Sequence, residues 1–329
     1  MSAEKKLAGS RVPIRPATSS VSAFLSRLID YAGLFPPASL PLDTAIRNFA
    51  AYRSGKDAWM LGRLIIPAAR LDELQPYVPL FDKGEPLAIS ALGRKSANGE
   101  AGLEALRADF ENIDAFCSRF QNKVKVEVLE VPLPALVPTR ELLAAISDQI
   151  VQRGMSAFCE VPLLGNGQRD LSETLEIIAA HNAETGIHLG VKLRTGGVKA
   201  EDFPTPEQIA AVMIGCRDQG IAMKFTAGLH HPLRMYREEV QTCMHGFINV
   251  FAAGMLAHVY KLDVATTAEI LADEAPSGFL VTEEELAWRS LKLARSQIEH
   301  LRQTAFCSYG SCSFDEPRED LRALGVLSD

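Results

Sequence analysis

Strand-like and helix-like segments alternate along most of this chain, and this alternation restricts the fold more than any other feature of the sequence. Short apolar runs recur roughly every 25–38 residues, which is the spacing of a βαβ repeat. Alternation of this kind predicts a parallel sheet covered by helices. Strand-like runs occur at residues 60–66, 86–92, 124–131, 157–161, 187–194, 221–227 and 247–252, and helical stretches at 42–53, 70–80, 100–119, 139–153, 170–185, 205–219 and 232–243.

The number of strands decides between two architectures. If residues 30–35 (DYAGLF) form a short first strand, the count is eight, which predicts a closed (β/α)8 barrel of the TIM type over residues 21–260. Without that segment, seven strands would fit an open, doubly wound sheet. No Gly-x-Gly-x-x-Gly motif follows an early strand, which weakens the open-sheet alternative. The motif EVPL supports the barrel, because it begins at Glu130 and again at Glu160 and so predicts matching depths on neighbouring strands.

The two ends of the chain do not follow the alternation. Residues 1–20 contain serine, proline and basic residues but no apolar segment, so we expect a flexible tail rather than a secretory signal. Residues 261–329 carry helical patterns without strands between them, and we expect a helical C-terminal extension packed on the barrel. Within it, residues 282–305 predict one long helix whose apolar face would lie against the barrel or against a second copy in a homo-oligomer.

Composition argues against several classes of function. The net charge is −7 and there is no basic patch, so nucleic acid is not an expected partner. No apolar run approaches the ~18 residues that would indicate a membrane span, and no membrane contact is expected. The six cysteines of this 329-residue chain do not form the framework of a small disulfide-rich protein, so we expect reduced thiols in a cytoplasmic protein. A small molecule remains the expected ligand.

Two lysines mark the expected site. Lys192 and Lys224 each lie in an otherwise apolar strand that runs into a glycine turn, and they are 32 residues apart (224 − 192). Burial of a charged lysine is energetically unfavourable, so a lysine in an apolar strand indicates an ion pair or a functional role. Because barrels carry their chemistry at the carboxyl ends of the strands, we expect both lysines at this mouth, together with Glu130 and Glu160 as catalytic groups. Asn249, on the expected eighth strand, would join them as a substrate-binding residue.

Each of these charged groups has two interpretations. A desolvated lysine beside a second cation has a lowered pKa and becomes nucleophilic at neutral pH, which is the role predicted for Lys192 with Lys224 as its neighbour. A buried ion pair between Lys192 and Glu160 is the structural alternative. The carboxylates of Glu130 and Glu160 suit general acid–base catalysis or a hard metal ion, unless one simply pairs with a lysine. Asp30, on the expected first strand, would point to the same mouth.

The glycine loops that follow the two lysine strands predict a place for an anionic group of the substrate. Gly196, Gly197 and Gly228 would leave backbone N–H groups beside the mouth, and Arg194 would add a bidentate contact to a phosphate or carboxylate. Ordinary turn formation would explain the same glycines.

Two adjacent histidines, His230 and His231, follow the strand of Lys224. Consecutive side chains of an extended chain point in opposite directions, so we expect at most one of them to serve the site, and His230 is the predicted substrate-binding residue. A capping or surface role before Pro232 is the alternative.

The stretch from residue 191 to residue 228 resembles the class I, Schiff-base aldolase barrels, and deoxyribose-phosphate aldolase most. The motifs VKLRTGG, TPEQ, CRDQG and KFTAG follow the order of that family's lysine with Thr-Gly, helix opened by Thr-Pro, and second lysine with Ala-Gly. The resemblance implies that Lys192 forms the Schiff base and that Lys224 lowers its pKa. Leu-Arg between Lys192 and Thr195, a single glycine followed by Leu-His-His after the second lysine, and the greater chain length depart from the family, so no substrate is implied.

Three functions are compatible with this pattern. The leading expectation is an enzyme: a lyase of the aldolase type that acts on a small carbonyl substrate, phosphorylated or not, through a lysine Schiff base and without a cofactor or metal. The second is an enolisation or isomerisation enzyme in which Glu130 and Glu160 bind Mg²⁺ or another divalent cation. The third is a non-catalytic barrel that binds a ligand.

Overall fold

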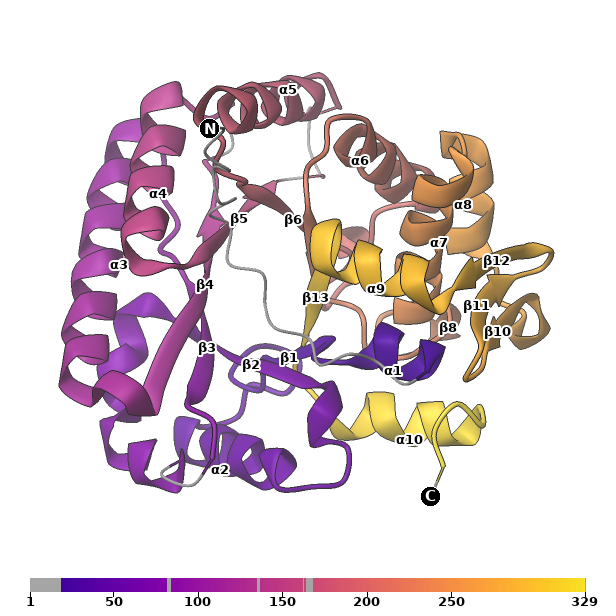
Figure 1. The fold of residues 1–329 in the computed structure, drawn as a ribbon, viewed down its shortest axis with the longest axis horizontal. Coiled ribbons are helices and arrows are strands. Elements are labelled where there is room, and N and C mark those ends of the chain that lie inside the picture. Colours follow the sequence, from indigo (N-terminus) through magenta and orange to yellow (C-terminus); the bar gives the residue numbers. More distant parts are fainter. Residues whose placement is uncertain (1–18, 82–83, 135–136, 162, 164–167, 329) are drawn as a thin grey trace, which may run out of the picture.

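Eight parallel strands form a closed barrel in the computed structural model, which describes residues 19–81, 84–134, 137–161, 163 and 168–328. Figure 1 shows the strands as a central ring with helices outside it. The order around the barrel is β1-β13-β7-β6-β5-β4-β3-β2, so the predicted (β/α)8 architecture is confirmed. The strands are β1 (Ile29–Tyr31), β2 (Leu61–Pro67), β3 (Leu87–Leu92), β4 (Val124–Pro132), β5 (Ser156–Val161), β6 (Gly190–Arg194), β7 (Met223–Thr226) and β13 (Phe306–Ser311).

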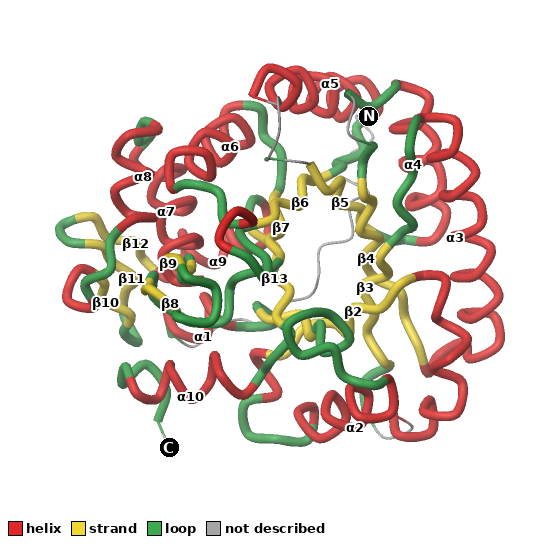
Figure 2. The backbone as a smooth tube through the Cα atoms, turned by 180° about the vertical axis from the view of Figure 1, so that it is seen from behind, coloured by secondary structure: helices red, strands yellow, loops and turns green. Residues whose placement is uncertain are grey.

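Helices follow the barrel strands and cover their outer faces, and Figure 2 shows the same two rings from behind. Thr205 illustrates how the sequence sets a helix start: its side chain accepts the backbone N–H of Gln208, and Pro206 occupies the first turn. The covering helices are α2 (Leu42–Arg53), the 3-10 helix η2 (Ala68–Phe81), α3 (Gly99–Phe120), α4 (Arg140–Arg153), α5 (Gln168–Thr185), α6 (Pro206–Asp218), α7 (Phe247–Tyr260), α8 (Val264–Ala272) and α10 (Asp315–Ala323).

The predicted position of the eighth strand is wrong. Residues 247–252 belong to helix α7, and the strand that closes the barrel is β13, which pairs with both β1 and β7. Every residue from Phe247 to Ala257 is buried. A helix that is apolar on all sides lacks the 3.6-residue period, and so its sequence resembles that of a buried strand.

The expected helical extension over residues 261–329 is also wrong in part. It contains a three-stranded antiparallel sheet and, in β13, a strand of the barrel itself. Residues 282–305 form two of the sheet's strands and one helix, because Arg289 turns the chain with a positive φ of 49° between the strands. The elements are β10 (Phe279–Val281), β11 (Glu285–Trp288), β12 (Leu291–Ala294) and α9 (Arg295–Thr304).

The segment 232–243, expected as a helix, instead contributes to an antiparallel hairpin of β8 (Met235–Arg237) and β9 (Thr242–Met244). Of the expected tail, residues 1–18 lie outside the described residues. Ser19 and Ser20 are described, and they cap and begin helix α1 (Ser20–Leu25). Helix α1 leads into β1 and α9 leads into β13, so these two helices lie together on the side where the strands begin.

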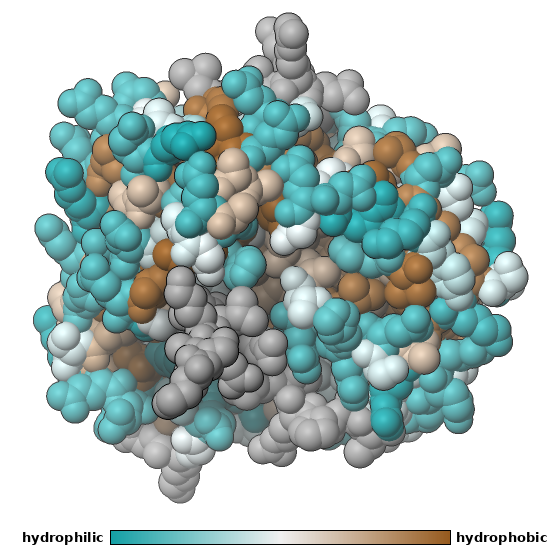
Figure 3. Space-filling view, turned by 45° about the horizontal axis from the view of Figure 1, so that its top comes forward, coloured by the Kyte–Doolittle hydropathy of each residue, from teal (hydrophilic) through white to brown (hydrophobic). Residues whose placement is uncertain are grey.

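Hydrophilic side chains cover most of the face drawn in Figure 3, with small apolar patches between them. Every helix in the described part of the chain is too short or too polar to span a membrane. All six cysteines are free thiols, as expected.

Candidate functional site

The strand register brings the predicted charged residues together inside the barrel. Glu160 is opposite Lys192 in the ladder of β5 and β6, and Lys192 is opposite Lys224 in the ladder of β6 and β7. Glu130 pairs with Phe158, two residues before Glu160. The expectation of matching depths for the two glutamates is therefore wrong, because neighbouring strands of a closed barrel are staggered.

Lys192 lies between both glutamates in spite of this offset. Its Nζ atom is 2.6 Å from Oε2 of Glu130 and 2.7 Å from Oε2 of Glu160. The lysine side chain is 4% exposed, and that of Glu130 is fully buried. One ammonium group thus contacts two carboxylates that come from two different strands.

Lys224 forms a second centre that is completely buried. Its Nζ atom contacts Oδ2 of Asp30, lies 3.4 Å from Oε1 of Glu130, and donates a hydrogen bond of 3.1 Å to Oγ of Ser308. Ser308 in turn donates to Oδ2 of Asp30 over 2.7 Å. Glu130 therefore links the two centres, with one oxygen on each lysine. We call Asp30, Glu130, Glu160, Lys192 and Lys224 the lumen network.

Solvent reaches the lumen network from one side. The side chains of Asp30 and Lys224 are fully buried, whereas Glu160 is 14% exposed. Arg194, which lies 3.8 Å from Glu160, is 51% exposed. The carboxyl end of β6 is therefore the mouth of the site, as expected for a barrel of this type.

Electrostatics in the lumen favour the charged forms. Burial alone would raise the pKa of Glu130, but Lys192 and Lys224 lower it below the usual range, and Ser90 donates a 2.7 Å hydrogen bond to its Oε1 atom. Burial alone would also raise the pKa of Asp30, which Lys224 and Arg63 lower instead.

The expected lowering of the lysine pKa is wrong for Lys192. Its burial lowers the pKa, but the attraction of Glu130 and Glu160 is stronger, and the pKa is raised above the usual value. In the resting site Lys192 is an ammonium ion, so any nucleophilic role requires that a neighbouring group first takes its proton.

The two glycine loops pack directly against each other. A Cβ atom on Gly196 would lie 2.4 Å from the ring of Phe203, and one on Gly228 would lie 2.8 Å from the same ring and 2.9 Å from Gly196 itself. Gly197 faces Asp202, whose carboxylate accepts the backbone N–H groups of the next two residues at 3.0 and 3.1 Å. Close packing therefore accounts for these glycines, and an acidic side chain already occupies part of the expected anion site.

His230 and His231 both reach helix α10. The Nδ1 atom of His230 lies 3.4 Å from Glu316 and 3.7 Å from Sγ of Cys312, and Nδ1 of His231 lies 2.6 Å from Asp320. Burial lowers the pKa of His230, but Cys312 and Glu316 outweigh it and raise the pKa to about 9. The expectation that the two side chains point apart is wrong, because the chain bends after β7.

Asn249 does not lie on a strand. It is a buried residue of helix α7, and its side-chain amide donates to the carbonyl oxygens of Ile270 and Asp273 at 2.9 and 2.8 Å. Its amide oxygen accepts the backbone N–H of Arg234 at 2.9 Å. These contacts tie α7 to the C-terminal end of α8 and to the segment before β8, which is a structural role rather than the predicted contact with a substrate.

Sequence reasoning missed the serines and the arginine that complete the lumen network. Ser90 and Ser308 carry little signal, since small polar residues are common in strands, and Ser308 also lies in a strand that was not predicted. Arg63, in the apolar run LGRLIIP, carries the same signal as the two lysines and could have been found by it.

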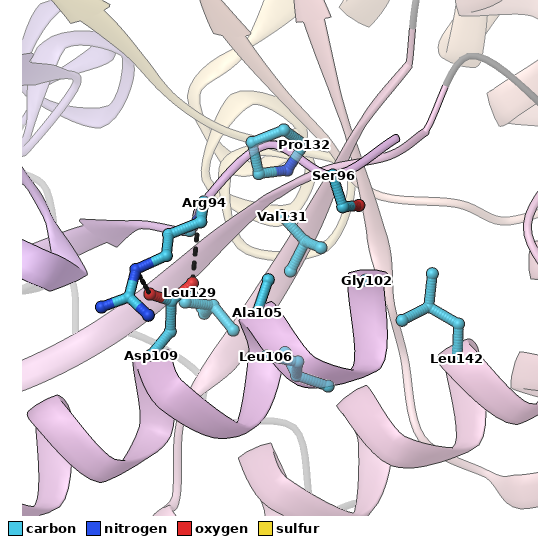
Figure 4. A pocket seen from close by; sticks show the side chains of 11 residues that line it. Arg94, Ser96, Gly102, Ala105, Leu106, Asp109, Leu129, Val131, Pro132 and Leu142 are labelled. Carbon is cyan, nitrogen blue, oxygen red and sulfur yellow. Dashed lines mark hydrogen bonds and ion pairs between the residues drawn. The ribbon is translucent and has the colours of Figure 1, made fainter. Parts of the chain in front are cut away.

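A small pocket lies outside the barrel, between the outer face of β4 and helices α3 and α4 (Figure 4). It is lined mainly by apolar side chains such as Leu106 and Val131, and its charged residues are already paired. Asp109 lies 3.3 Å from Nε of Arg94 and accepts the backbone N–H of that residue at 2.8 Å. The pocket is a packing gap and is separate from the lumen network.

Comparisons with known proteins do not identify a family. No family matches the chain, and no characterised protein matches it. One similar structure is lysine/ornithine decarboxylase complexed with cadaverine from Vibrio vulnificus, with a TM-score of 0.40 and 9% identity over 88% of this chain and 58% of that chain. Another is pyruvate carboxylase from Rhizobium etli, with a TM-score of 0.40 and 13% identity over 74% of this chain and 24% of that chain. Because the scores are low and the chain spans little more than half of the first protein, these likenesses carry no functional argument.

Proposed function

We propose that this protein is a lyase of the aldolase type that acts on a small carbonyl substrate through a Schiff base on Lys192. The observation that carries the proposal is the position of Lys192 Nζ, 2.6 and 2.7 Å from two carboxylates at the solvent-facing side of the lumen network. A lysine in this position has a proton acceptor on either side. It also has a second ammonium group nearby, since Lys224 shares Glu130 with it.

The first step is a proton transfer from Lys192 to Glu130 or Glu160. This transfer turns an ion pair into two neutral groups, so it creates no new charge in a poorly solvated interior. The free amine then attacks the carbonyl carbon, and a proton moves from the attacking nitrogen to the former carbonyl oxygen, which gives a neutral carbinolamine. The protonated glutamate is placed to supply the proton with which that oxygen leaves as water, giving the iminium ion.

The iminium ion draws electrons from the carbon–carbon bond one position further on, between its α and β carbons. When a base removes the proton of a hydroxyl group on the β carbon, the bond between the α and β carbons breaks, the β carbon leaves in a carbonyl product, and an enamine remains on Lys192. Glu160 is the partly exposed carboxylate next to Lys192 and is suited to this proton transfer. Protonation of the enamine and addition of water release the second product and restore the amine.

The exposed guanidinium of Arg194 supports a substrate with an anionic group. It lies at the mouth, 3.8 Å from Glu160, and guanidinium groups bind phosphate and carboxylate in a bidentate manner. We therefore propose that the carbonyl substrate carries a phosphate or carboxylate at the end away from the reacting carbon.

Borohydride trapping tests the proposal. The protein is mixed with a panel of small aldehydes and ketones, with and without anionic groups, and reduced, and the adduct is located by mass spectrometry of peptides. We expect one adduct on Lys192, and none with Lys192→Arg, because a guanidinium stays protonated and forms no imine. Lys56→Arg, at an exposed position, is the matched control and should trap like the unchanged protein.

Three other results would contradict the proposal. An adduct on Lys224 alone would move the nucleophile to the deeper centre. Stoichiometric binding of a divalent cation that depends on Glu130 and Glu160 would favour metal-assisted enolisation instead. Binding of a small molecule without adduct or turnover would favour a ligand-binding barrel.

A further inference from the structure

Arg63 is buried inside the barrel, on strand β2. Its side chain is 1% exposed, although an unpaired guanidinium in such a place would be very unfavourable. Two carboxylates compensate for its charge. The Nη1 atom lies 3.6 Å from Oδ1 of Asp30, and the Nε atom lies 3.0 Å from Oε2 of Glu127.

Asp30 is fixed through both of its oxygens. Oδ1 accepts the backbone N–H of Arg63 at 2.7 Å and faces its guanidinium, whereas Oδ2 contacts Lys224 and Ser308. The neighbouring Gly62 is required for this position, since a Cβ atom there would lie 2.1 Å from Oδ1. Strand β2 thus fixes the Asp30 carboxylate through Oδ1, while Oδ2 of the same carboxylate contacts Lys224.

Because Arg63 pairs with both Glu127 and Asp30, a continuous series of charged groups, alternately positive and negative, runs through the barrel. The outer end is Arg27, which lies 2.8 Å from Glu127, and its side chain is 25% exposed. The series then passes through the buried guanidinium to the lumen network and reaches the mouth. In order, it consists of Arg27, Glu127, Arg63, Asp30, Lys224, Glu130, Lys192, Glu160 and Arg194.

We propose that Arg63 is a positioning residue of the site: it keeps Asp30 negatively charged and keeps Oδ2 of that carboxylate on Lys224. The proposal rests on the proposed Schiff-base function, because it assigns a remote residue to the same centre. Arg63 touches neither Lys192 nor the mouth, and it acts only through Asp30.

The chemistry of the guanidinium explains why this residue suits the position. Arginine stays protonated at any pH at which the protein works, so its charge does not respond to events at the mouth. Oδ2 of Asp30 contacts both Lys224 and Ser308, and these are the groups with which the carboxylate can exchange a proton. A permanent cation on the other side of Asp30 opposes that exchange, because it favours the ionised carboxylate.

The test compares three variants that are expected to change the titration of Asp30 in different directions. Arg63→Met removes the charge and keeps the volume, Arg63→Lys keeps the charge, and Glu127→Gln frees the guanidinium from its other carboxylate. The first readout is the titration of Asp30 in protein labelled with ¹³C at the aspartate side-chain carboxyl carbon, assigned with Asp30→Asn. The second is the pH dependence of borohydride trapping on Lys192.

We expect Arg63→Met to move the Asp30 titration to higher pH and to lower the trapping rate on the acid side by roughly tenfold, as the loss of an adjacent opposite charge implies. Arg63→Lys should restore most of both. Glu127→Gln should move the Asp30 titration to lower pH. Arg70→Met, at an exposed ion pair on η2, is the control and should change neither.

The outcomes separate this inference from the proposed function. If no carbonyl is trapped but Asp30 titrates as expected in the variants, the Schiff-base function fails and the control of Asp30 by Arg63 stands. If trapping occurs but Asp30 titrates at the same pH in every variant, the positioning role is overturned. If Arg63→Met does not fold, the Asp30 titration in Glu127→Gln still tests the positioning role: a move to lower pH supports it, and no move or a move to higher pH overturns it.

Discussion

The inner and outer parts of the lumen network are built from the same residue types but differ in their access to water. In the inner part, Asp30 and Lys224 are fully buried and each has several partners. In the outer part, Glu160 is 14% exposed and its neighbour Arg194 is 51% exposed. The difference indicates a division of labour: the inner charges are fixed in one arrangement, and the outer charges can exchange their partner for a substrate.

The largest difference between the two parts should appear in stability. Asp30→Asn leaves the charges of Arg63 and Lys224 facing a neutral amide, and breaking a buried ion pair in this way costs about 3–5 kcal/mol. The measurement is the free energy of unfolding from urea denaturation at pH 7. A loss below about 1 kcal/mol would show that the inner charges are not fixed, and the proposed division would then be wrong.

Acid should weaken the inner part selectively. The pKa values of Asp30 and Glu130 are lowered in the folded protein, so these groups contribute stability that is present above their unfolded values, 3.8 and 4.5, and is lost as the pH falls through the folded values. We expect the free energy of unfolding to fall below about pH 4, and to fall less in Asp30→Asn. Equal slopes in both proteins would place the acid sensitivity elsewhere.

The smallest effect on stability is expected at the mouth. Arg194→Met removes a partner of Glu160 that lies 3.8 Å away in contact with solvent, and exposed pairs contribute about 0–1 kcal/mol. The same change should raise the KM of an anionic substrate about tenfold or more while kcat changes little, since it removes a charge-assisted contact. A loss of stability as large as that of Asp30→Asn would contradict the comparison.

The barrel and the charged residues of the lumen network could be predicted because their signals are local. A lysine within an apolar run marked Lys192 and Lys224, and the EVPL motif marked Glu130 and Glu160. The structure brings these four charged residues into one set of contacts. The stagger between Glu130 and Glu160 could not be predicted, because register depends on closure of the whole barrel.

The inner partners were missed for a different physical reason. Ser308 lies on β13, about 80 residues after β7, and the segment between them contains a helix that is apolar on all sides. Such a helix takes the place of the eighth strand in any interpretation by pattern. Because a long segment separates β7 from β13 and contains this helix, neither β13 nor the serine that it supplies to Asp30 was predicted.

The late position of β13 also has a consequence for how the chain reaches its folded state. Strand β1 pairs on one side with β2, which follows it closely, and on the other side with β13, from Phe306 to Ser311. During synthesis, one edge of β1 and one edge of β7 therefore stay unpaired until nearly the whole chain has left the ribosome. A chain that ends before residue 306 would lack β13, and it would hold an open sheet with two unpaired edges that is prone to association with other chains.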